Sequence, residues 1–143
     1  MEIKEQLKDE KKEEKKTRDS AIIRTTMPAS MKHSMSIINF IKGKSVGESL
    51  ELLEKVKKMK IAVPMKGEIP HRKGMASGRY PIKAADMFIK LLKGISSNAS
   101  QLGVDGDLVI RGKANIAPRS MRPGRFRHKF KKVHVELRLE KKW

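Results

Sequence analysis

Apolar and polar positions alternate most clearly near the end of the chain. There, every second residue is apolar in the run Val133, Val135, Leu137 and Leu139. An earlier run follows the same rule at Leu108, Ile110, Gly112, Ala114 and Ile116. A period of two is the pattern of a strand with one buried face. Because the residues between the runs are rich in proline, glycine and arginine, the two strands are predicted to form a long β-hairpin over residues 108–135.

Helical spacing predicts three helices, over about 30–42, from 45 onward, and over about 81–101. Gly43 and Gly103 follow the first and third, where glycine often ends a helix. Ser45 and Glu48 form a capping-box pattern at the start of the second, and Pro81 is placed to open the third. The third has the widest apolar face and is expected to be the central core helix. In the first, the expected buried stripe is Met31, Met35, Ile38 and Ile41.

The remaining segments are shorter or less regular. Residues 20–26 read as a short strand that can pair with the hairpin. Residues 61–80 contain three glycines and two prolines, which predicts a long irregular segment, and segments of this kind are usually functional or disordered. Residues 1–19 are dense in charges of both signs and are expected to form a disordered tail.

Composition narrows the class of partner. The 143 residues carry a net charge of +18, which favours a polyanion such as nucleic acid or an anionic membrane surface. With 4% aromatic residues, a stacking platform for single strands is disfavoured. The chain has no cysteine, which excludes disulfides and thiolate metal sites. No apolar run has transmembrane length, so the cytosol is the simplest compartment.

The hairpin carries most of the candidate binding chemistry. Between Asp107 and Glu136 no residue is acidic, whereas nine are basic: Arg111, Lys113, Arg119, Arg122, Arg125, Arg127, Lys129, Lys131 and Lys132. Fourteen extended residues span about 45 Å, so the far end must stand out from a small domain. An isolated two-stranded ribbon is marginally stable, and like charges destabilise it further. A polyanionic partner is therefore expected to complete it.

A second basic patch lies in the irregular segment, at Lys66, His71, Arg72, Lys73 and Arg79. His71 has no second histidine or carboxylate at ligand spacing, so a phosphate or base contact is favoured over a metal ion. No metal or cofactor site is predicted anywhere in the chain.

Six stretches together resemble a known family: residues 42–46, 71–75, 78–85, 91–93, 98–99 and 122–125. In order and spacing they are similar to the universal L-twenty-two family of large-subunit ribosomal proteins, and residues 71–75 look like its archaeal form. The resemblance covers roughly Thr25 to Leu139. One departure is that Pro123 directly precedes Gly124, so the hairpin tip is several residues shorter than in the usual family pattern.

The resemblance implies an α+β fold, with three helices packed on a small three-stranded antiparallel sheet and a long protruding β-hairpin. Residues 20–143 would then form a single domain that binds large-subunit rRNA. Family members also place the hairpin tip near the wall of the peptide exit tunnel. The implied body contacts are Lys32, His33, Lys42, Lys44, Arg79 and Lys83, and the implied tip residues are Arg119, Met121, Arg122, Pro123 and Arg125. The implied partners are large-subunit rRNA, neighbouring ribosomal proteins and the nascent peptide, all in the cytoplasm.

The leading hypothesis is a structural rRNA-binding protein, and the alternative is an architectural DNA-binding protein that inserts a basic β-ribbon into the minor groove. An enzyme is disfavoured because no carboxylate pair, nucleophile motif or phosphate loop accompanies the scattered histidines, His33, His71, His128 and His134. A membrane-surface role is disfavoured because the helices lack aromatic anchors.

Overall fold

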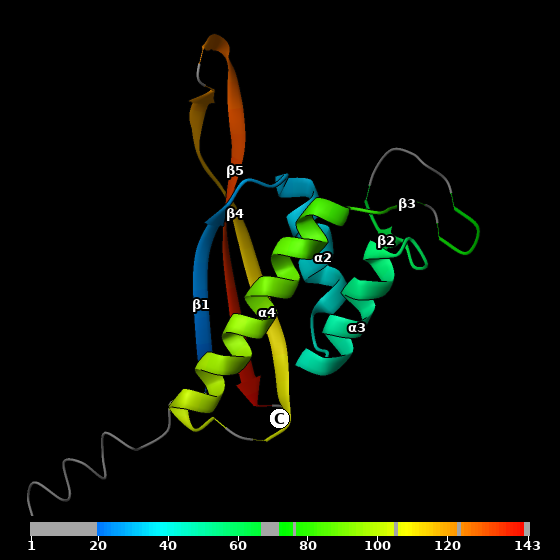
Figure 1. The fold of residues 1–143 in the computed structure, drawn as a ribbon. Coiled ribbons are helices and arrows are strands. Elements are labelled where there is room, and N and C mark those ends of the chain that lie inside the picture. The colour runs from blue at the N-terminus through cyan, green and yellow to red at the C-terminus, as the bar shows by residue number, and fades with distance from the viewer. Residues whose placement is uncertain (1–19, 67–71, 76, 105, 123, 142–143) are drawn as a thin grey trace, which may run out of the picture.

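A computed structural model of the chain describes residues 20–66, 72–75, 77–104, 106–122 and 124–141 (Figure 1). For residues 122 and 125–128 it describes the backbone but not the side chains. The predicted disordered tail over residues 1–19, and the predicted contacts of His71 and Pro123, therefore lie outside the described residues.

The main sheet has three antiparallel strands, β1 (Ser20–Met27), β4 (Leu108–Arg122) and β5 (Arg125–Lys141), in the order β1-β5-β4. The ladder of β1 and β5 runs from the pair Ser20–Glu140 to the pair Met27–Val133. This confirms that the short N-terminal strand pairs with a hairpin arm. The three helices and three-stranded antiparallel sheet also confirm the α+β fold class.

The alternation on β5 is confirmed, because Val133, Val135, Leu137 and Leu139 are all buried. On β4 it holds for Ile110 and Ala114, but Ile116 is 70% exposed. Ile116 pairs with Val133 at the last position where β1 is still present. Apolar spacing alone does not reveal where the sheet loses its third strand, and so the inward-facing run ends one position earlier than predicted.

The three helices are α2 (Met31–Ile41), α3 (Val46–Lys57) and α4 (Ile82–Leu102). The capping box at the start of α3 is confirmed, since Ser45 and Glu48 each accept a backbone N–H from the other at 3.3 Å. Gly43 and Gly103 have φ values of 76° and 66°, and each follows a helix as predicted. Pro81 is the N-cap residue of α4 and not its first helical residue.

The predicted apolar stripe of α2 is wrong in one position. Ile37, Ile38 and Ile41 are fully or almost fully buried, whereas Met35 is 38% exposed. The α2 sequence offers two overlapping apolar stripes, and the one containing Ile37 faces β4 and the core. Packing against the sheet decides between them, and that choice leaves Met35 on the surface.

The segment from 61 to 80 is more regular than predicted. Its ends form a small two-stranded sheet of β2 (Val63–Pro64) and β3 (Gly78–Arg79), with Val63 fully buried. The Met65 N–H donates to the Ser77 carbonyl at 3.0 Å and extends the pairing. Two-residue strands are too short to produce a periodic signal, which explains why they were not predicted.

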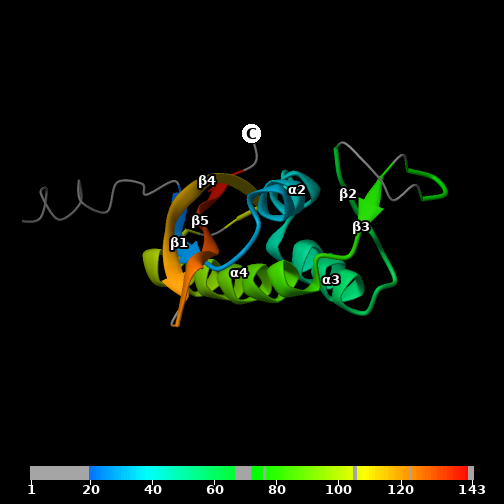
Figure 2. The ribbon, with the colours of Figure 1, turned by 90° about the horizontal axis from the view of Figure 1, so that it is seen from above.

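The helices cover one face of the main sheet (Figures 1 and 2). α4 packs beside β1 and α2 beside β4, while α3 lies outside them against α4. The connection between α2 and α3 is tied to the edge of β4 by two backbone hydrogen bonds. Gly43 N–H donates to the Ile110 carbonyl at 2.9 Å, and Ile110 N–H donates to the Lys44 carbonyl at 3.1 Å. Among the described residues, no helix is both long and apolar enough to cross a membrane.

Candidate nucleic-acid interface

Beyond the body, β4 and β5 continue as a ribbon of two strands (Figure 1). The pair Ala117–Lys132 is the first one past the end of β1, and the ladder reaches Arg122–Arg125 at the tip. Gly124 next to this last pair has a φ of 70°, a left-handed conformation that favours glycine. The side chains of Arg119, Lys129 and Lys131 are exposed along the ribbon, and that of Lys132 is half-buried.

Several apolar side chains are also exposed on the ribbon and at its base. Ile116 is 70%, Met121 57% and Phe130 40% exposed. The structure thus places the predicted tip residues Arg119 and Met121 on the free part of the hairpin. The proposed contacts of Arg122, Arg125 and Arg127 stay predictions, because their side chains lie outside the described residues.

The base of the hairpin has a different electrostatic character. β5 extends to Lys141, which brings Glu136 opposite Lys113 and places Glu140 within 3.1 Å of the Arg111 guanidinium. No residue from 108 to 135 is acidic, but Glu136 and Glu140 of β5 lie next to the first part of this segment. Only from Ala114 to the tip do both strands lack acidic residues. Arg111 and Lys113 therefore remain predicted RNA contacts in partly neutralised surroundings.

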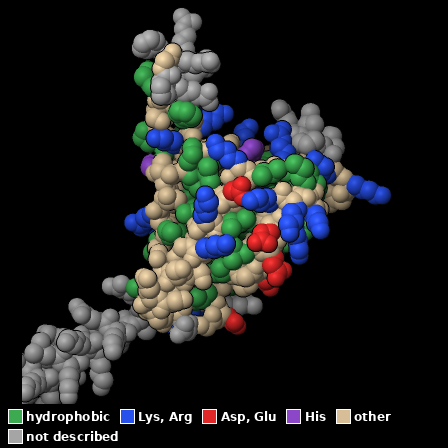
Figure 3. Space-filling view, in the orientation of Figure 1, with side chains coloured by type: hydrophobic (Ala, Val, Ile, Leu, Met, Phe, Trp, Pro, Cys, Tyr) green, Lys and Arg blue, Asp and Glu red, His purple; other side chains and the backbone are tan. Residues whose placement is uncertain are grey.

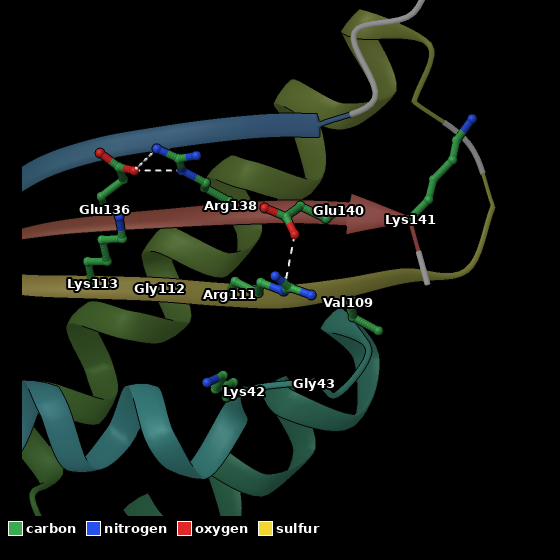
Figure 4. Close-up of a pocket in the computed structure, with 10 residues that line it drawn as sticks. All are labelled: Lys42, Gly43, Val109, Arg111, Gly112, Lys113, Glu136, Arg138, Glu140 and Lys141. Carbon is green, nitrogen blue, oxygen red and sulfur yellow. Dashed lines mark hydrogen bonds and ion pairs between the residues drawn. The ribbon is translucent and has the colours of Figure 1, made fainter. Parts of the chain in front are cut away.

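The open face of the sheet carries a small network of ion pairs around Glu136 (Figure 4). Its carboxylate accepts hydrogen bonds from Arg24 Nε at 2.8 Å and from Arg138 Nε at 2.6 Å. These bonds, that from Arg138 first, hold the pKa of the Glu136 carboxyl below its usual value. Glu136 and Arg138 line a hollow in this face, and Lys42 and Lys141 line it as well. Its mixed charges make this face a weaker phosphate surface than the ribbon.

Three predicted contact residues from distant parts of the chain influence one another electrostatically near the junction of body and ribbon. His33 on α2 is half-buried, and both Arg79 on β3 and Lys131 on β5 act on its charge. Burial first, then these two cations, lower the pKa of the His33 imidazole. A neutral imidazole under the influence of two cations is suited to a phosphate, whose charge would offset the repulsion. We refer to His33, Arg79 and Lys131 as the junction cluster.

Arg72 has an internal structural role in addition to its predicted contact. Its guanidinium lies over the Tyr80 ring, 4.6 Å from the centroid. Its Nε also donates to the Gly78 carbonyl at 3.2 Å. Arg72 therefore helps to hold the loop against β3. Lys73 and Lys83 are exposed.

Another set of predicted contacts gathers beside α2. Lys32, Lys42 and Lys44 line one groove together with Lys66 from the segment after β2. The family resemblance implies separate RNA contacts for the first three, and no pattern in the sequence predicts that they share a groove. The grouping arises because β2 packs next to α2, a tertiary contact without a local signal.

Charge is unevenly distributed over the surface (Figure 3). In the view shown, Lys and Arg side chains extend over the upper and middle parts of the body, and acidic side chains lie among and below them. The exposed acids of α3 are Glu48, Glu51 and Glu54. Lys57 pairs with Asp86 of α4 at 2.8 Å. Within the described part of the chain, no three His, Asp or Glu residues form a group that could hold a metal ion.

Comparison with known proteins gives a consistent set of relatives, although no family model matches the chain. The "Large ribosomal subunit protein uL22" of Archaeoglobus fulgidus is 38% identical over 100 residues, covering 66% of this chain and 64% of the relative. The protein of the same name from Methanoculleus marisnigri is 38% identical over 85 residues, or 55% of this chain and 56% of the relative. That from Staphylothermus marinus is 31% identical over 103 residues and 66% of each. The chain thus spans less than two thirds of the length of these relatives.

Proposed function

We infer that this chain, which belongs to the uL22 family of large-subunit ribosomal proteins and is of the archaeal type, is a structural constituent of the large ribosomal subunit. The observation that carries the inference is the ribbon beyond Ala117, where two paired strands bear exposed cations and no acidic residue. Such an element is poorly stabilised alone and needs a polyanion around it.

The partner we propose is large-subunit rRNA. Lysines such as Lys129 and Lys131 would neutralise phosphates and release counterions, which makes binding strongly dependent on salt. Folded rRNA contains irregular clefts that a thin ribbon can enter, whereas a regular duplex offers only its grooves. The junction cluster and the lysines beside α2 would extend the contact from the ribbon onto the body.

For the tip, we propose a position at the wall of the peptide exit tunnel, as the family resemblance implies. Exposed Met121 and the glycine turn at Gly124 support a slender end that can fit a confined space. Neighbouring large-subunit proteins would contact the body, and a nascent peptide would pass the tip. The role is structural and non-catalytic, and its location is the large subunit in the cytoplasm.

The test combines co-sedimentation with salt-dependent binding. The chain is expected to sediment with large ribosomal subunits and to bind large-subunit rRNA fragments in preference to duplex DNA. A Lys129→Ala/Lys131→Ala variant is expected to lower the logarithmic salt slope by about 1.4–1.8. Its matched control, Lys90→Ala/Lys93→Ala, removes the same charge from exposed positions of α4 and is expected to leave the slope unchanged. Equal binding to rRNA and duplex DNA, or equal slopes for the two variants, would contradict the proposal.

A further inference from the structure

An apolar groove lies between α2 and the segment after β2. Its apolar lining consists of Met31, Met35, Phe40, Pro64 and Met65, and its volume is about 850 Å³. Met35 is 38% exposed although it is a large apolar side chain. Phe40 is only partly buried against the core. We call this feature the methionine groove.

The charge around the methionine groove has a single sign. Its ionisable lining residues are Lys32, Lys42, Lys44 and Lys66, and no carboxylate lines it among the described residues. The open face of the sheet differs, because Glu136 and Glu140 neutralise its arginines. The groove therefore favours a ligand that is both anionic and apolar.

An unpaired nucleotide has both of these properties. Its base presents a flat apolar face, and its phosphates can reach lysines at the rim. Methionine sulfur packs favourably against aromatic rings, and Phe40 supplies a ring of its own. Ser36 and Asn39 also line the groove and carry polar groups suited to a base edge. A volume of about 850 Å³ accommodates a nucleotide and lies in the range of typical ligand sites.

We propose that the methionine groove binds an unpaired nucleotide of RNA, with the base against Met35 and Phe40 and the flanking phosphates at the rim lysines. This inference rests on the proposed rRNA-binding function and deepens it by naming a site on the body, separate from the hairpin. A regular duplex keeps its bases stacked and paired, so it would not fill the groove.

The first test follows the methionine methyl groups by NMR, with the full chain labelled at those methyls. Titration with a short oligoadenylate is expected to shift Met31, Met35 and Met65 upfield through the ring current of the base. Met59, 58% exposed at the end of α3, serves as the control methyl and is expected not to move. An abasic oligonucleotide of equal charge is expected to leave all four in place. Equal shifts with the abasic strand would overturn the base-binding assignment.

The second test measures affinity with two matched variants. Met35→Ala and Met59→Ala both truncate an exposed methionine on the body and leave every charge in place. Met35→Ala is expected to weaken binding to oligoadenylate by roughly 5- to 150-fold, the range for loss of one base contact, and Met59→Ala by less than about twofold. Thermal melting of both variants checks that the fold is intact.

The outcomes separate this inference from the function on which it rests. If Met35→Ala binds both oligoadenylate and rRNA fragments like the parent chain, the groove assignment fails while rRNA binding stands. If a polyglutamate peptide shifts the groove methyls and oligoadenylate does not, the groove is a protein-docking surface and the assignment also fails. If the parent chain binds no rRNA at all, the proposed function and the inference fall together.

Discussion

Among single residues, His33 gives the clearest link between structure and binding. It is half-buried on α2, and two other elements each contribute a cation that acts on its charge, Arg79 and Lys131. Burial and these charges disfavour the imidazolium, so the pKa of His33 is below its ordinary value and the ring is neutral near pH 7. A bound phosphate would favour the protonated ring. RNA binding and proton uptake at His33 should therefore be coupled.

We predict that RNA affinity rises as the pH falls from about 7.5 to about 5.5, and that His33→Gln removes part of this rise. The folding stability of the free chain should depend on pH in the opposite direction from the RNA affinity. Because the folded-state pKa is lowered, the stability from His33 is complete above about pH 6.5 and is lost as the pH falls below it.

Binding measured at constant salt across this range tests the coupling. His134→Gln is the control, since His134 bonds Thr26 at 2.7 Å on the open face of the sheet. An unchanged pH profile in His33→Gln would rule out the coupling.

Gly112 shows how closely β4 approaches α2. A Cβ placed there would lie 2.8 Å from Leu137 Cδ2 and 3.2 Å from Ile38 Cγ2, closer than side chains normally pack. We predict that Gly112→Ala destabilises the fold by about 1–3 kcal/mol, the usual cost of overpacking. Gly47→Ala on α3 is the control, because nothing lies within 4 Å of its Cβ position. It should be neutral or stabilise by up to about 1 kcal/mol. Urea unfolding measures both, and similar stabilities for the two variants would show that the contact relaxes without cost.

At the scale of elements, the sequence predicts what local chemistry determines. The ends of α2 and α4 follow from Gly43 and Gly103, and the start of α3 follows from the Ser45–Glu48 capping box. The β5 strand follows from its alternation. Each of these signals lies within a few residues of the feature that it predicts, and so tertiary packing does not override it.

Features that depend on tertiary contacts could not be predicted in the same way. Neither the pairing of Arg111 with Glu140 nor the meeting of His33 with Lys131 has a local signal. Both depend on strand register and on the placement of α2. The exposure of Met35 depends likewise on which of two apolar stripes faces β4. For this reason the basic residues and their concentration on the hairpin were predicted from the sequence, but the junction cluster and the groove beside α2 were not.

The hairpin should be separable from the body, because the described residues of segment 118–131 contribute nothing to the core cluster. Replacing this segment by Asn-Gly would join Ala117 to Lys132, which already face each other in the ladder. We predict a change in unfolding free energy of less than about 1 kcal/mol. The salt slope of rRNA binding should fall by about four to five, because six cations are lost. Calorimetry and a salt series test the two parts. A collapse of the fold would show that the ribbon stabilises the body.

Over the whole molecule, the charge asymmetry predicts an orientation. The ribbon, the junction cluster and the methionine groove all carry exposed cations, and two of the three involve α2. The exposed acids of α3 and the Lys57–Asp86 pair lie elsewhere on the body. Phosphate would be repelled by those carboxylates and attracted to the cations. The chain should therefore approach RNA with its ribbon and α2 side foremost.

We predict that this orientation appears in a lysine-reactivity footprint. Acetylation of the free chain and of its complex with large-subunit rRNA is compared residue by residue by mass spectrometry. Binding should protect the lysines of the groove and the ribbon: Lys32, Lys42, Lys44, Lys66, Lys129 and Lys131. Lys58, at the end of α3, and Lys90 and Lys93, on the exposed side of α4, should keep their reactivity because they lie outside the proposed contact surface.

Protection in proportion to exposure alone, equal for Lys90 and Lys129, would mean that RNA covers the molecule without a preferred face. Protection of the ribbon lysines but not of those beside α2 would confine the interface to the hairpin, because a phosphate at the groove rim must shield at least one of its ammonium groups.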